Sequence, residues 1–112
     1  MNEDKLKIIL IFKKFFLDIY DTLINCDKKH LELKKIVLNE CNLFLKDLYL
    51  ANDMQDINSR LKKKEELVIR IKHISSLLNF LKFYKMISHK KYLKLGNDLE
   101  VILRLASGWK NK

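Results

Sequence analysis

Residues 86–109 have the sequence MISHKKYLKLGNDLEVILRLASGW and contain the clearest helix signal in the chain. Ser88 is a residue type that caps the free amides at a helix N-terminus. Gly108 stands where a helix end needs a residue in the left-handed conformation. Between them, apolar residues recur every three or four positions and so share one helix face: Tyr92, Leu95, Leu99, Ile102, Ala106 and Trp109. The pattern predicts a helix here.

The same spacing recurs in three earlier segments, so the chain is predicted to be all-α. The earlier stripes are Ile8, Phe12, Phe15, Ile19 and Leu23; Val37, Cys41, Phe44, Leu48 and Ala51; and Leu67, Ile71, Ile74, Leu78 and Leu81. Asp27 and Asp53 are the predicted N-caps of the second and third helices. The predicted helices span about residues 4–25, 28–50, 54–86 and 88–107. Four helices joined by short turns predict a single domain over residues 1–112, an up-down-up-down antiparallel four-helix bundle.

Two of the predicted helices carry more apolar residues than one stripe explains. The first has Ile9, Leu10, Ile11, Phe16 and Leu17 off its stripe, and the third has Val68, Ile69, Leu77, Phe80, Phe83 and Tyr84. Such a helix is either buried on several sides or packed against another subunit, and the small size of the domain favours the subunit contact. The run LKIILIF also has strand-like composition, but the helical period around it favours a helix.

No pattern of catalytic or metal-binding residues occurs in the sequence. It has no G-x-S-x-G elbow, no glycine-rich phosphate loop and no E-x-x-H pair of the kind found in di-iron bundles. Cys26 and Cys41 are too few for a zinc site and are interpreted as ordinary thiols. The three histidines are isolated and are interpreted as solvated: His30, His73 and His89. We therefore expect no enzymatic activity and no cofactor.

The sequence also predicts no contact with a membrane. The longest uninterrupted apolar run, residues 8–12, is far shorter than the roughly 20 residues that span a bilayer. Residues 1–17 do not resemble a signal peptide, because Glu3 and Asp4 stand where positive charge is expected and Lys13 interrupts the apolar region. We expect a cytoplasmic protein.

Positive charge is concentrated in the last third of the chain. Residues 67–112 hold ten Lys or Arg and two acids, so they contribute +8 of the formal net charge of +9. In an antiparallel bundle, the end of the third helix and the start of the fourth lie at one end, where their fields add and attract phosphate backbones. A lysine-rich surface that only keeps the protein soluble is the alternative. The predicted nucleic-acid-binding residues are Arg70, Lys72, Lys82, Lys85, Lys90, Lys91, Lys94 and Arg104.

Four aromatic residues lie between these cations: Phe80, Phe83, Tyr84 and Tyr92. Their helical spacing predicts positions in the core rather than a surface on which bases stack. The predicted interaction is therefore with the phosphate backbone and is largely independent of nucleotide sequence.

Residues 77–112, LLNFLKFYKMISHKKYLKLGNDLEVILRLASGWKNK, resemble the C-terminal half of a family of four-helix-bundle proteins. The family includes the accessory variability determinant of diversity-generating retroelements and the 23S rRNA intervening-sequence proteins. The matching features are a long third helix that runs into Met86-Ile87-Ser88, then Lys91-Tyr92, Leu99 and Ile102, and Gly108-Trp109-Lys110 at the end.

The resemblance implies a ring-like homopentamer of four-helix bundles with a positively charged surface that binds RNA or DNA. It also implies that the ring is a partner of a reverse transcriptase. The alternatives are an oligomeric structural adaptor, or a bundle encoded in an rRNA intervening sequence with no nucleic-acid role.

Overall fold

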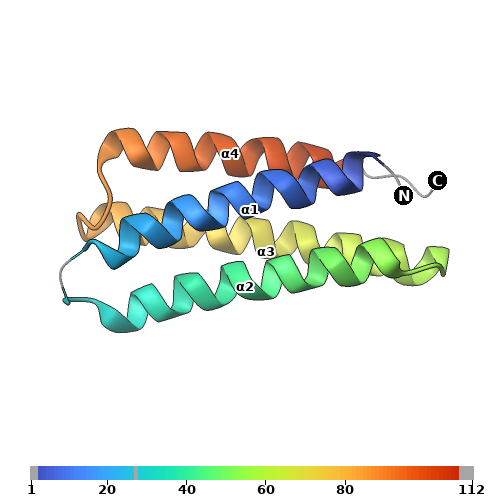
Figure 1. Cartoon of the computed structure of the whole chain (residues 1–112), viewed down its shortest axis with the longest axis horizontal. Helices are drawn as coiled ribbons and strands as arrows, with labels where there is room; N and C mark the ends of the chain where they lie inside the picture. The colour runs from blue at the N-terminus through green and yellow to red at the C-terminus, as the bar shows by residue number, and fades with distance from the viewer. Residues whose placement is uncertain (1–2, 27, 109–112) are drawn as a thin grey trace.

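The computed structural model describes residues 3–26 and 28–108, which contain four α-helices and no strand. Each helix is antiparallel to the next and packs against two neighbours, in the cyclic order α1, α2, α3, α4 (Figure 1). The bundle is elongated, with extents of 44 × 23 × 18 Å. The prediction of an all-α four-helix bundle is confirmed. The helices are α1 (Glu3–Ile24), α2 (Leu31–Asp53), α3 (Ile57–Phe83) and α4 (His89–Ser107).

The predicted apolar stripes form the core of the bundle. Every member of the first three stripes is at most 2 % exposed, as are four members of the fourth: Leu95, Leu99, Ile102 and Ala106. Tyr92 is half-buried at the edge of the core. Trp109, which the stripe also included, lies outside the described residues. Spacing of three and four positions therefore identified the faces that pack together.

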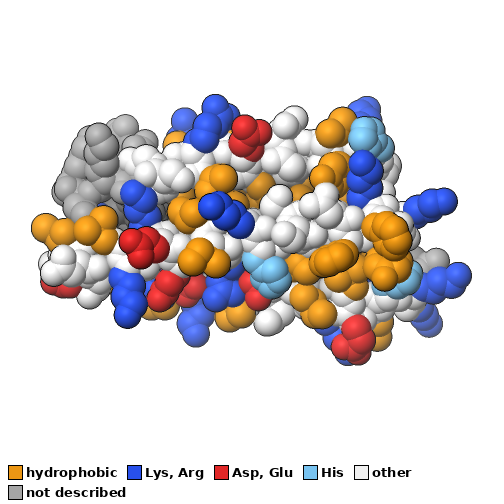
Figure 2. Space-filling model, turned by 180° about the vertical axis from the view of Figure 1, so that it is seen from behind, with side chains coloured by type: hydrophobic (Ala, Val, Ile, Leu, Met, Phe, Trp, Pro, Cys, Tyr) orange, Lys and Arg blue, Asp and Glu red, His pale blue; other side chains and the backbone are white. Residues whose placement is uncertain are grey.

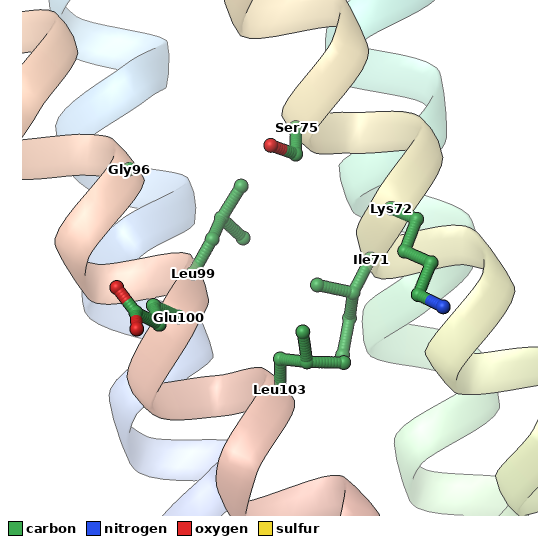
Figure 3. Close-up of a pocket in the computed structure, with 7 residues that line it drawn as sticks. All are labelled: Ile71, Lys72, Ser75, Gly96, Leu99, Glu100 and Leu103. Carbon is green, nitrogen blue, oxygen red and sulfur yellow. The ribbon is translucent and has the colours of Figure 1, made fainter.

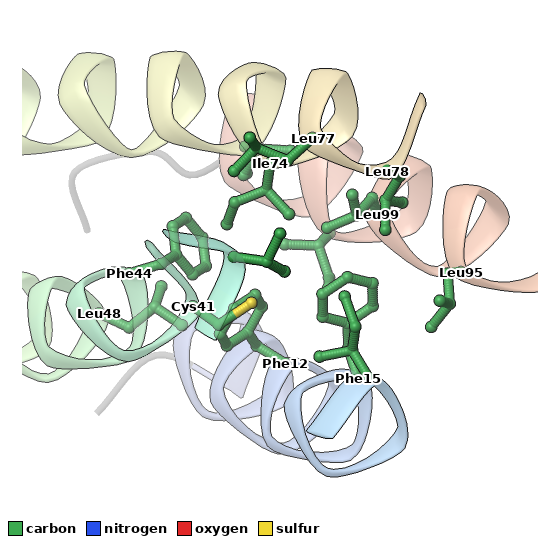
Figure 4. Packing of buried hydrophobic residues seen from close by; sticks show 14 of the residues in the cluster. Phe12, Phe15, Cys41, Phe44, Leu48, Ile74, Leu77, Leu78, Leu95 and Leu99 are labelled. Atoms are coloured by element: carbon green, nitrogen blue, oxygen red, sulfur yellow. The ribbon is translucent and has the colours of Figure 1, made fainter. Parts of the chain in front are cut away.

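An aromatic cluster holds α1 against α2 in the middle of the core. The ring centroids of Phe12 and Phe44 lie 4.4 Å apart, and those of Phe12 and Phe15 lie 5.5 Å apart. Each such pair contributes about 0.5–1.5 kcal/mol beyond the apolar area that it buries. The thiol of Cys41 lies beside these rings (Figure 4), where burial raises its pKa to about 12. Cys41 is therefore a small apolar core residue.

The ends of α2 differ from the prediction. The helix begins at Leu31 rather than Lys28, after an N-cap residue, His30, that has a left-handed conformation (φ 60°) and makes no side-chain cap hydrogen bond. The predicted cap, Asp27, lies outside the described residues. At its other end α2 continues to Asp53, because packing of Ala51 in the core holds this last turn.

The prediction that Asp53 caps α3 is therefore wrong, because this residue is still helical. Asp56 is the N-cap, and its carboxylate accepts hydrogen bonds from the backbone amide and the hydroxyl of Ser59, both at 2.8 Å. The hydrogen bond from the Ser59 backbone amide lowers the pKa of Asp56, and the hydrogen bond from the Ser59 hydroxyl lowers it further. At the start of α4 the predicted cap is confirmed: the Ser88 hydroxyl accepts from the amide of Lys91 at 3.0 Å.

The third helix ends at Phe83, three residues earlier than predicted, in a turn centred on Lys85. Lys85 has a left-handed conformation (φ 59°), its amide donates to Lys82 O, and the amide of Met86 donates to Leu81 O. These two bonds are those of a Schellman motif, in which glycine is the usual left-handed residue. The prediction of a left-handed Gly108 is wrong, since its φ is −83° and its amide still donates to Arg104 O.

Candidate nucleic-acid interface

The eight predicted site residues do not all lie together. Five of them follow one another through the end of α3 and the start of α4: Lys82, Lys85, Lys90, Lys91 and Lys94. Arg70 and Lys72 lie in the middle of α3, and Arg104 lies in the last turn of α4, near the opposite end of the bundle. The structure therefore groups five of the eight and separates three.

Three of the predicted residues are held in ion pairs with acids on other helices. Arg70 of α3 binds two carboxylates of α2, with 2.9 Å from Nη1 to Glu40 Oε2 and 3.5 Å from Nε to Asp47 Oδ2. Lys91 and Lys94 of α4 bind Asp18 of α1. The expectation that the fields of the basic residues add is therefore wrong for these three, because antiparallel packing brings acids from α1 and α2 against them.

Asp18 is the acceptor that holds the start of α4 to α1. Its two oxygens lie 2.8 Å from Lys91 Nζ and 2.7 Å from Lys94 Nζ, and Lys94 Nζ also lies 3.1 Å from Asp98. Partial burial raises the pKa of Asp18, but the hydrogen bonds from Lys91 and Lys94 outweigh this effect and hold that pKa below its ordinary value of 3.8. Lys91 and Lys94 are therefore interpreted as stabilising residues.

The remaining lysines of the α3–α4 turn are exposed and keep their charge available. Lys82, Lys85 and Lys90 make no ion pair with a carboxylate anywhere in residues 3–26 and 28–108. Lys82 Nζ lies 4.6 Å from the centroid of the Tyr92 ring, a cation–π contact that orders the side chain without neutralising it. Of the eight predicted residues, these three lie close together in the chain at this turn without a carboxylate partner among the described residues.

The α1–α2 loop adds lysines that the prediction did not include. It lies beside the α3–α4 turn (Figure 1), since Cys26 Sγ is 2.9 Å from Met86 O and the rings of His30 and Tyr84 are 4.5 Å apart. The two pairs Lys28-Lys29 and Lys34-Lys35 are the signal that was missed. In an up-down-up-down bundle the first and third connections lie at the same end, so these pairs join the basic turn.

We define the basic end as the exposed lysines of these two connections and of the helix ends beside them: Lys28, Lys29, Lys35, Lys82, Lys85 and Lys90. Figure 2, which shows the bundle from behind, has Lys and Arg side chains gathered at the right, where the two connections lie. Residues 25–35 and 80–90 together contain seven lysines and two acids, Asp27 and Glu32. Lys34 turns inward and donates to the carbonyl of Cys26 at 3.2 Å. Positive charge therefore dominates this end.

Lys72 lies at a different feature, a shallow groove of about 320 Å³ between α3 and α4 (Figure 3). Ile71, Leu99 and Leu103 line it, and the small residues Ser75 and Gly96 leave it open. The Lys72 side chain extends away from α4. Glu100 also lines the groove, so Lys72 lies near an acid and apart from the lysines of the α3–α4 turn.

Other kinds of site have no support in the part of the chain that the structure describes. None of its helices combines the length and apolarity needed to cross a membrane. No three His, Cys, Asp or Glu side chains among those residues are grouped as metal ligands. Comparisons of the chain with models of protein families, with curated proteins and with solved structures find no match. The functional proposal therefore depends on the geometry of this chain.

Proposed function

We propose that this protein is a non-enzymatic accessory protein that binds RNA or DNA through the basic end, largely independently of nucleotide sequence. One observation carries the proposal: the fold brings lysines from two distant loops together at one end of the bundle, where their fields add. Among these, Lys82, Lys85 and Lys90 have no carboxylate partner in the described residues.

Binding through these lysines follows from counterion release. Each phosphate that a lysine neutralises releases condensed cations from the nucleic acid, so the affinity falls as the salt concentration rises. Lysine is a flexible point charge without the planar fork that arginine offers to a guanine edge. The basic end therefore recognises the backbone.

The test measures fluorescence anisotropy of labelled RNA and DNA at about 50 mM and about 200 mM salt. We expect the double variant K85Q/K90Q to weaken binding severalfold at low salt and to reduce the slope of log affinity against log salt by roughly 2, because each lysine contributes roughly 1. Both side chains are exposed, so helicity should not change.

The matched control is K46Q/K62Q, which removes the same charge from exposed positions on α2 and on the first half of α3. We expect it to leave the salt slope of the parent protein nearly unchanged. Equal losses in the two variants would show that only net charge matters and would overturn the assignment to the basic end. No binding at low salt by the parent protein would overturn the function itself.

Because of the resemblance described above, we also propose that copies of this bundle form a ring-like homopentamer that partners a reverse transcriptase. An apolar groove between α1 and α2, with a volume of about 540 Å³, supports an assembly: Phe16, Leu17, Tyr20 and Leu45 line it, with Lys13 at its edge. Light scattering should give five copies, and a monomer would contradict the ring. Capture of the reverse transcriptase should survive nuclease treatment.

The second candidate is a structural adaptor, or a bundle encoded in an rRNA intervening sequence, without a nucleic-acid role. The ion pairs of Arg70, Lys91 and Lys94 favour it, because part of the basic character of the last third serves to hold helices together. Gene neighbourhood separates the candidates. A reverse transcriptase gene with a template repeat supports the first, and a position inside an rRNA gene supports the second.

A further inference from the structure

The aromatic residues at the end of α3 are exposed, although their spacing predicted core positions. The exposed fraction is 52 % for Phe80, 76 % for Phe83 and 48 % for Tyr84. The side of α3 that faces the core is already filled by Ile74, Leu77, Leu78 and Leu81, so these three rings point outward. A group of exposed aromatic rings on a small protein marks a binding surface.

The rings are held in contact with one another at the basic end. Phe83 meets Tyr84 edge to face, with centroids 5.1 Å apart and planes at 85°. Tyr84 in turn lies 4.5 Å from the ring of His30, at the start of α2. A row of three rings therefore runs from α3 to α2, and the contacts within it reduce the freedom that a ligand would otherwise have to restrict.

A second aromatic pair lies at the start of α4. The rings of His89 and Tyr92 are stacked with centroids 6.4 Å apart, and Lys82 lies over Tyr92. The hydroxyl of Tyr92 donates to Asn79 Oδ1 at 2.6 Å, which fixes the ring against α3. The contact with Tyr92 joins one lysine of the basic end to this second aromatic pair.

The backbone at this end also adopts an uncommon conformation. His30 and Lys85 are the non-glycine residues with positive φ in residues 3–26 and 28–108, at 60° and 59°. One carries a ring of the aromatic row and the other carries a lysine of the basic end. Glycine would adopt either conformation more easily, so the chain keeps these two side chains at positions where they strain the backbone.

We propose that the basic end binds single-stranded RNA or DNA, with bases stacked on Phe83 and Tyr84 and phosphates bound by Lys82, Lys85 and Lys90. This inference rests on the proposed function and adds the class of ligand. In a duplex the base faces are covered by their neighbours, whereas a single strand offers both its base faces and its backbone. Exposed rings between lysines match that combination.

Charge favours a nucleic acid over a protein as the occupant of this surface. No Asp or Glu occurs between residues 67 and 97, and Glu32 is the acid in the first turn of α2. A partner protein that docks an apolar helix here would place charges of both signs against Lys82, Lys85 and Lys90, which lack carboxylate partners. A polyanion offers a negative group to each of these three lysines.

The experiment compares binding of a single strand of about 16 nucleotides with binding of the duplex of the same sequence, by fluorescence anisotropy. We expect the parent protein to bind the single strand more tightly. F83A should weaken binding of the single strand by about 5- to 150-fold, which is the range for loss of one stacked base. Binding of the duplex should hardly change.

Two further variants separate stacking from simple apolar contact. F83L keeps most of the apolar area but removes the ring, so we expect it to bind as weakly as F83A. I69A truncates an apolar side chain of α3 that is 67 % exposed and lies away from the row, and we expect it to bind like the parent. Thermal unfolding of all three should match the parent within a few degrees, because neither side chain is in the core.

The possible failures are distinguishable. If F83A binds the single strand as tightly as the parent while K85Q/K90Q binds it weakly, stacking is wrong and the proposed function stands. If F83L binds as tightly as the parent, the surface is an apolar contact, as for a protein partner, and the inference is overturned. If the parent protein binds neither the single strand nor the duplex at low salt, both proposals are wrong.

Discussion

The two ends of the bundle differ in how their turns are stabilised. At the α2–α3 turn, the Asp56 carboxylate caps the start of α3 by accepting two hydrogen bonds from Ser59. At the basic end, α2 starts without a side-chain cap and α3 stops at a left-handed lysine. One end uses residues that suit its backbone, whereas the other places His30 and Lys85 where glycine would fit better.

The ends also differ in charge and exposed surface. The α2–α3 turn carries Asp53 and Asp56 beside Arg60, and a shallow polar depression there is lined by backbone and side chains of residues 52–55 and Arg60. The basic end combines lysines with exposed rings. Such a difference is expected if the side chains of the basic end serve the proposed binding at some cost in stability.

The largest effect on stability is expected at the α2–α3 turn. D56A removes both hydrogen bonds to Ser59, and loss of a side-chain cap of this kind should lower the melting temperature by roughly 4–8 °C. Thermal unfolding followed by circular dichroism measures the change. Affinity for nucleic acid should stay the same, and a loss of binding in D56A would mean that the two ends are not independent.

A change of the opposite sign is expected at the basic end. K85G replaces a strained left-handed lysine with the residue that a Schellman motif prefers, so it should stabilise the protein by about 0.5–1 kcal/mol. The same variant should bind nucleic acid more weakly, because it removes a charge. Urea unfolding and anisotropy on one sample test both outcomes.

The comparison between the two ends fails if K85G leaves both the free energy of unfolding and the affinity for nucleic acid unchanged, or if it lowers both. A matched variant, K85Q, removes the charge but keeps a side chain in the left-handed conformation. It should bind as weakly as K85G without the gain in stability.

The smallest effect is expected at Asp18, whose pairs with Lys91 and Lys94 are only partly buried. The folded pKa of Asp18 is below its ordinary value of 3.8, so its contribution to stability is complete above that pH and is lost as the pH falls through the folded pKa. D18N should therefore be slightly less stable than the parent at pH 7, and the difference should shrink toward about pH 3.

Urea unfolding at both pH values measures this difference. The control is D21N, which changes an exposed acid one turn along α1 whose carboxylate has no ion-pair partner among the described residues, and it should match the parent at both pH values. A constant gap between D18N and the parent would show that the effect is not electrostatic.

Much of the fold follows from local pattern. Phe12, Phe44 and Leu99 each belong to an apolar stripe at helical spacing on their own helix, and all three are buried because that face packs into the core. The Ser88 cap was predictable because it involves residues within one turn. The N-cap of α2 was not predictable from the sequence, because the position of His30 depends on contacts with the α3–α4 turn.

The candidate site was only partly predictable, since local sequence does not identify neighbours in space. No acid follows Arg70 in the chain before Asp98, yet Glu40 on α2 lies 2.9 Å from its guanidinium. Lys28 is far from Lys85 in the chain, yet the α1–α2 loop that carries Lys28 lies beside the α3–α4 turn that carries Lys85 (Figure 1). Phe83 follows the helical period of the core but extends outward, because Leu78 and Leu81 already fill the space within.

By themselves, the apolar stripe in residues 86–109 and the three stripes before it determined the number of helices and the faces that pack, because periodicity acts within a single helix. The composition determined the excess of positive charge. Only the tertiary structure decided which charges remain available. Antiparallel packing pairs Arg70, Lys91 and Lys94 with acids from α1 and α2. It also places the α3–α4 turn beside the lysine-rich α1–α2 loop (Figure 1). A charge is neutralised by whatever lies within a few ångströms, and those distances depend on how the helices pack.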